Sequence, residues 1–214
     1  MGLTKKVGLL STTSVGGVAG AAALAHHLTS EDKVKTFSDK LRKDHFTLIS
    51  KEEGWNSILS EYKQNKIAVG QLFKSGGNMT LEELKSSCER IAKQDLDDSK
   101  NYSEFRRLCT VPKTIKSHLD SYGIVALGLE AEDTKDKDSW GKLKDAYVKL
   151  GKNIILNLRE NLNNKQGGKE EWQIFQEACK GLSEIKSTDT EFDFSFDDFK
   201  AWCTTQAVDK LKNS

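Results

Sequence analysis

Large apolar residues recur along this chain at positions i, i+3 and i+7. These three positions share one face of an α-helix, whereas a β-strand would place them on opposite faces. The segments with this pattern are Trp55/Ile58/Tyr62, Leu81/Leu84/Cys88, Tyr102/Phe105/Cys109, Trp140/Leu143/Tyr147, Trp172/Phe175/Cys179 and Phe196/Phe199/Cys203. Their last residues are, in order, Tyr, Cys, Cys and again Tyr, Cys, Cys. The pattern therefore predicts an all-α body that contains two copies of a three-helix unit.

Breaks in the pattern place the boundaries of these units. Pro112 is the single proline of the chain and predicts that the helix containing Cys109 ends before it. We expect a first three-helix unit at 50–112, a linker at 113–139 and a second three-helix unit at 140–214, with a stalk at 29–49 before them. Within the linker, the mixed apolar run at 115–129 fits a strand pair, a helix or a connector, and we favour a helix.

Capping patterns refine the expected helix starts. A Ser or Thr followed three residues later by an acid can form a capping box, and this occurs at Thr29/Asp32, Ser50/Glu53, Thr80/Glu83 and Ser195/Asp198. We expect a first core helix at 51–64, a helix that continues from Trp140 to Leu162, and a last helix capped by Ser195. Residues 188–194 are expected to approach that last helix in an extended conformation, with Phe194 packed on Phe199.

The N-terminal segment 1–28 is predicted to be a transmembrane helix or signal anchor. Val7 to Leu28 contains no Asp, Glu, Lys or Arg, and a helix of that length crosses a hydrocarbon core of about 30 Å. Lys5 and Lys6 precede it, so the positive-inside rule predicts a single-pass cell-membrane protein with most of the chain outside. The small residues at 21–25 also fit cleavage by a signal peptidase.

Charge and motif content exclude several classes of function. Lys and Arg number 33 against 32 Asp and Glu, so no net field draws the chain to nucleic acid. The glycine pairs lack the spacing of a nucleotide-binding loop, and the acids between Asp189 and Asp198 lack the order of a calcium loop. We predict no catalytic residues, no cofactor and no metal site, and therefore that the chain is not an enzyme.

The cysteines leave two alternatives. Cys88, Cys109, Cys179 and Cys203 have no CxxC or Cys/His spacing, so they are poor zinc ligands. They are either buried thiols that act as small apolar side chains or one disulfide per unit, Cys88–Cys109 and Cys179–Cys203, formed in an oxidising exterior.

Three short segments resemble a known group of proteins. These are the lysine-bearing N-terminus with its Gly/Ala/Val span, the Leu-Ile-Ser-Lys-Glu-Glu-Gly-Trp sequence at 48–55 with Tyr62 and Lys63 after it, and the Phe-Lys-Ala-Trp-Cys sequence at 199–203. Together they resemble the large paralogous families of uncharacterised proteins of haemotropic mycoplasmas. The resemblance implies an exported or membrane-anchored protein of a wall-less bacterium that lives on red blood cells. It also argues against cleavage, because such organisms look poorly equipped with the usual signal peptidase.

The expected function is a non-catalytic surface protein that acts as a variable host-interaction or antigenic module. Its expected partners are the membrane, through the N-terminal helix, and a protein of the host-cell surface. The alternative is an intracellular, membrane-associated scaffold that binds a partner helix. The sequence leaves the oligomeric state open.

Overall fold

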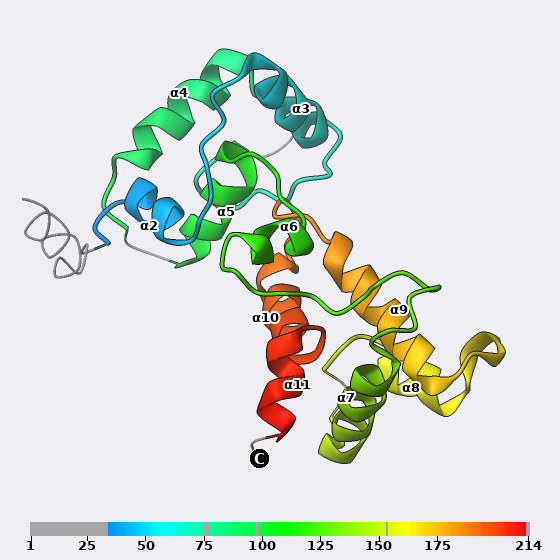
Figure 1. The fold of residues 1–214 in the computed structure, drawn as a ribbon. Helices are drawn as coiled ribbons and strands as arrows, with labels where there is room; N and C mark the ends of the chain where they lie inside the picture. The colour runs from blue at the N-terminus through cyan, green and yellow to red at the C-terminus, as the bar shows by residue number, and fades with distance from the viewer. Residues whose placement is uncertain (1–33, 75–77, 97–98, 153, 213–214) are drawn as a thin grey trace, which may run out of the picture. The chain divides into compact units, whose positions relative to one another are not determined.

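The computed structural model describes residues 34–74, 78–96, 99–152 and 154–212 (Figure 1). In these residues it contains ten α-helices and no β-strand, so the predicted all-α class is confirmed. The α-helices are α2 (Phe37–Lys43), α3 (Glu52–Lys63), α4 (Leu81–Ala92), α5 (Ser99–Cys109), α6 (Ile115–Asp120), α7 (Lys137–Leu150), α8 (Leu158–Asn163), α9 (Glu171–Glu184), α10 (Phe192–Trp202) and α11 (Thr205–Lys212), with a 3-10 turn, η1 (Gln166–Gly168).

The predicted membrane segment at 1–28 lies outside the described residues, as do Lys5, Lys6 and the Thr29/Asp32 cap. Among the helices of the described part, none has the length and apolarity needed to cross a bilayer.

The core contains the helix faces that the spacing predicts. Of the residues in the repeated pattern, Leu81 and Phe196 are half-buried and all the others are buried. They belong to one continuous cluster of buried apolar side chains that extends through both halves of the chain. Because such burial removes apolar area from water, this shared core is the main source of stability.

One of the expected caps is present in the structure, and two others differ. Thr80 and Glu83 form the predicted capping box of α4. In contrast, Lys51 rather than Ser50 precedes α3 and makes no side-chain cap bond, although the predicted helix itself is present. The last core helix begins at Phe192, because that ring is buried against Phe46 and His118, and Ser195 therefore lies inside α10.

Two further expectations need correction. The helix that begins near Trp140 ends at Leu150, because Gly151 adopts a left-handed conformation, and α8 is a separate helix. The run at 115–129 is helical only over α6, then turns at 121–123 and continues as an irregular segment in which Ala126 forms an antiparallel bridge to Thr204. A glycine at the end of a helix takes positive φ without a Cβ penalty, which explains why the apolar pattern beyond Gly151 could not extend the helix.

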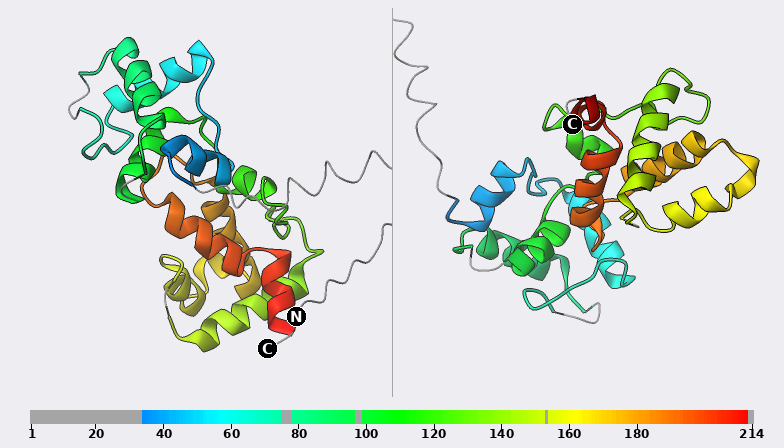
Figure 2. Two further views of the ribbon diagram at one scale, coloured as in Figure 1. Left: turned by 90° about the vertical axis from the view of Figure 1, so that its left-hand side faces the viewer. Right: turned by 90° about the horizontal axis from the view of Figure 1, so that it is seen from below.

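The two halves repeat the same set of backbone contacts. In each half, one β-bridge joins the residue before the first helix to the segment after the helix that carries the first disulfide cysteine. A second β-bridge joins the segment before the second helix to the Thr that follows the second disulfide cysteine. The bridges are Thr36↔Asp95 and Leu48↔Thr110 in the first half, and Thr114↔Lys186 and Ala126↔Thr204 in the second. Helices α2, α3, α4 and α5 therefore correspond to α6, α7, α9 and α10, and Figures 1 and 2 show α2 to α5 and α7 to α10 as two groups.

The repeated unit is thus larger than the expected three helices. Residues 34–49 are part of the first unit and not a stalk, because Phe37 and Leu41 of α2 are buried and the Phe37 ring lies 5.3 Å from that of Phe105. Likewise, the expected linker at 113–139 provides α6, the first helix of the second unit. Helices α8 and α11 have no counterpart in the described part of the first unit.

Candidate functional site

A groove of about 760 Å³ lies in the second half. It is lined by the segment 154–156 between α7 and α8, by one face of α9 and by the start of α10. The residues of α9 that line it are largely apolar and include Ile174, Ala178 and Leu182. The groove therefore combines apolar walls with an opening to solvent.

Three large apolar side chains stand exposed along this groove. Leu156 and Phe194 are each 78% exposed, and Ile154 is 36% exposed. Single exposed apolar residues are common on protein surfaces, but several gathered at one groove are typical of a binding surface.

Local backbone geometry explains why these side chains point outward. The Tyr147 hydroxyl accepts a hydrogen bond from the Ile155 amide at 2.9 Å, and the Ile155 side chain is buried. Its two neighbours, Ile154 and Leu156, therefore face away from the core. On α10, Phe194 follows the buried Phe192 by two residues, which is a rotation of about 200° around a helix. The predicted packing of Phe194 on Phe199 is wrong for this reason.

The charged groups on the groove are mainly acidic. Glu177 is paired with Lys169 at 2.7 Å, which leaves Glu191 and Asp198 without a cation among the described residues. Burial raises the pKa of the Asp198 carboxyl, and the neighbouring charge of Asp197 raises it further. An occupant that offers N–H donors or a positive charge would therefore be stabilised here.

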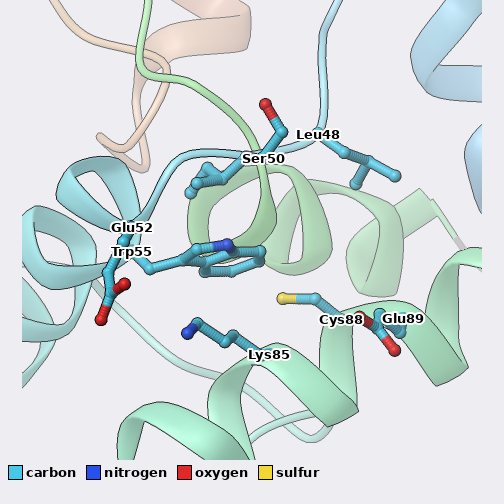
Figure 3. A pocket seen from close by; sticks show the side chains of 8 residues that line it. Leu48, Ser50, Glu52, Trp55, Lys85, Cys88 and Glu89 are labelled. Atoms are coloured by element: carbon cyan, nitrogen blue, oxygen red, sulfur yellow. The ribbon is translucent and has the colours of Figure 1, made fainter.

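A smaller hollow of about 480 Å³ lies in the first half, between the segment 48–50, α3 and α4 (Figure 3). The Trp55 indole crosses it, and the sulfur of Cys88 points toward this ring from α4. Cys88 is bonded to Cys109 and so offers no thiolate. The groove of the second half is larger and carries exposed apolar side chains, so it is the better candidate site.

The four cysteines form two disulfides in the structure. Cys88 is joined to Cys109 and Cys179 to Cys203, with Cα–Cα separations of 5.6 and 5.7 Å. All four residues are buried. The sequence had left this pairing open against free thiols, and the repeated contacts of the two halves place both bonds at equivalent positions.

The acids between Asp189 and Asp198 serve several separate structural roles. Asp189 accepts a hydrogen bond from the Lys186 amide at 2.9 Å, Asp193 pairs with the buried Arg106, and Asp197 lies 3.7 Å from Lys200. Across the residues that the structure describes, no group of three or more His, Cys, Asp or Glu side chains is placed to hold a metal ion.

Sequence reasoning missed two buried charged residues, Glu104 and Arg106. Both lie on α5 beside Phe105, and both are at least 97% buried. Arg106 stacks between the rings of Phe46 and Phe192, at 5.3 and 4.9 Å. Their positions on the helix, next to the core residue Phe105, were the signal that could have indicated burial. A charged residue at such a position, however, more often lies at the edge of a solvent-exposed face.

Comparisons with protein-family models, curated proteins and solved structures found no match for this chain. The case for a function therefore depends on the groove, the disulfides and the sequence pattern.

Proposed function

We propose that this chain is a non-catalytic surface protein, exported or membrane-anchored, which acts as a variable host-interaction or antigenic module. The observation that carries the proposal is the pair of buried disulfides at equivalent places in the two halves. Disulfides form and persist mainly in oxidising compartments outside the cytoplasm. The uncharged span behind Lys5 and Lys6 and the resemblance to haemotropic mycoplasma families point in the same direction.

The groove supports a binding role. Leu156 and Phe194 expose large apolar surfaces at its edge, and burying such area against a partner is favourable by about 25 cal/mol per Å² before the costs of association. A surface module can use such a groove to contact a host protein. The alternative, an intracellular scaffold that binds a partner helix, could use the same groove, so location decides between the two.

Protease treatment of intact cells tests the location. We expect loss of the 34–214 region from intact cells, with digestion in lysed cells as the control for the intrinsic resistance of the folded body. Alkylation of cell extracts before and after reduction, followed by mass spectrometry, should show thiols that become reactive only after reduction. Survival in intact cells with free thiols would instead support the intracellular scaffold.

A further inference from the structure

Glu104 and Asp198 occupy equivalent positions in the two halves. Each lies five residues before the second disulfide cysteine of its half, Cys109 or Cys203. The helix ends that follow are also alike. The threonine after each cysteine donates its hydroxyl to the carbonyl four residues earlier, at 2.8 Å for Thr110 and 3.0 Å for Thr204. The two acids therefore lie in matching local structure.

In the first half, the acid binds a segment of backbone. The Glu104 carboxylate accepts hydrogen bonds from the amides of Gln71, Leu72 and Phe73, at 2.9, 3.1 and 3.1 Å. Phe73 is buried, and Tyr62 donates its hydroxyl to the carbonyl of Lys74. The segment 70–74 thus combines consecutive amides on a carboxylate, one buried aromatic ring and a lysine.

In the second half, the chain takes another path. Tyr147, the counterpart of Tyr62, also forms a hydrogen bond to the backbone after its helix, at Ile155. The chain then continues into the helix α8. Among the described residues, no backbone amide donates to Asp198. The space beside Asp198 is the groove lined by Leu156, Phe194 and the apolar face of α9.

We propose that this groove binds an extended peptide segment of a partner protein, which donates consecutive backbone amides to Asp198. An apolar side chain of that segment packs against Leu156 and Phe194, and a basic residue lies near Glu191. Such a peptide would offer the same groups as the segment 70–74 of the first half, namely consecutive backbone amides, an apolar ring and a lysine. The unpaired carboxylates of the groove are complementary to the positive charge of that lysine. The proposal applies on either side of a membrane, so it goes beyond the proposed function and does not depend on it.

The test uses a probe whose sequence the first half supplies. A fluorescent peptide of residues 69–74, Val-Gly-Gln-Leu-Phe-Lys, with blocked ends, is titrated into the full-length chain and followed by fluorescence anisotropy. We expect saturable binding that a scrambled peptide does not show. Methylation of the peptide amides at the Leu and Phe positions should weaken binding about tenfold, because it removes donors to Asp198.

Matched variants locate the site. Asp198→Asn should weaken peptide binding about tenfold, since it removes the charge that strengthens the hydrogen bonds, whereas Asp197→Asn should leave binding unchanged. Phe194→Ser should also weaken it, without loss of folding because that ring is exposed. Binding equal to that of the scrambled peptide, or equal effects of Asp198→Asn and Asp197→Asn, would overturn the proposal. So would self-association that Phe194→Ser abolishes while the peptide fails to bind, since the occupant would then be a second copy of the chain.

Discussion

Arg106 of the first half forms an ion pair with Asp193 of the second. The Arg106 side chain is 3% exposed, whereas that of Asp193 is 51% exposed. The guanidinium also lies over the rings of Phe46 and Phe192, so one buried cation contacts residues of both halves. Phe46 stacks in turn on His118 at 4.2 Å. This cluster, together with the continuous apolar core, holds the two repeats against each other.

We therefore predict that Asp193→Ala destabilises the fold by about 2 kcal/mol, because it leaves the Arg106 charge buried without its carboxylate partner. Asp197→Ala is the control, since the exposed pair with Lys200 should contribute no more than about 0.5 kcal/mol. Chemical denaturation of both variants measures the difference. Adding Arg106→Met to Asp193→Ala should recover part of the loss. A double variant less stable than Asp193→Ala alone would contradict the buried-charge explanation.

The disulfides should contribute similarly to stability. They close loops of similar length, with sequence separations of 21 and 24 residues. Replacing either pair by alanines should cost about 3 kcal/mol, because the unfolded chain regains the freedom that the loop constraint removed. Thermal melting with and without reductant measures this for the natural chain. An unchanged melting temperature after full reduction would show that the cross-links do not stabilise the fold.

His118 should make stability depend on pH in a mildly acidic range. Burial, with the nearby charges of Lys113 and Arg106, lowers the His118 pKa to about 4 from an ordinary 6.5. The unfolded state therefore binds the proton between pH 6.5 and 4, while the folded state does not. The contribution of His118 to the free energy of unfolding is fully present above pH 6.5. It falls by roughly 2 to 3 kcal/mol as the pH drops from 6.5 to 4, and it levels off below pH 4.

The measurement is the free energy of unfolding of the natural chain and of His118→Phe at several pH values. Carboxylates titrate in part of the same window, so the difference between the two proteins isolates the histidine. Parallel curves between pH 6.5 and 4 would show that His118 does not carry this dependence.

Glu104 should hold the segment 70–74 in place. Glu104→Gln removes the charge and places an NH₂ group against backbone amides. We therefore expect the free energy of unfolding to fall by about 2 to 4 kcal/mol. Hydrogen exchange at the amides of residues 71–73 should accelerate more than exchange in α9. Asp198→Asn is the matched control in the other half. It should be neutral or slightly stabilising, because burial already disfavours the Asp198 charge. Equal losses for the two variants would contradict the different roles of these acids.

Local patterns foresaw the helices well. The spacing of Trp55, Ile58 and Tyr62, and of its five counterparts, predicted helices with the correct inward faces, because a helix repeats every 3.6 residues wherever it lies. The Thr80/Glu83 cap was predicted for the same reason, since its hydrogen bonds join residues three apart. The order of the last residues also indicated a duplication.

The extent of each repeat could not be predicted from the same patterns. The bridge from Leu48 to Thr110 and that from Ala126 to Thr204 join residues far apart in sequence, and they assign 34–49 and α6 to the repeats. Short helices such as α2 and α6 carry weak periodic signals of their own. Their burial, and not their propensity, makes them part of the fold.

The sequence alone therefore determined the helical class, the inward faces, the repeated order and the uncharged span at 7–28, since each depends on neighbours within a few turns of chain. Tertiary structure decided whether the cysteines are bonded or free, which charges are buried and which apolar side chains remain exposed. Glu104 and Asp198 illustrate the division. They hold equivalent places on similar helices, but only the path of distant chain segments makes one a buried anchor for backbone amides and leaves the other on an open groove.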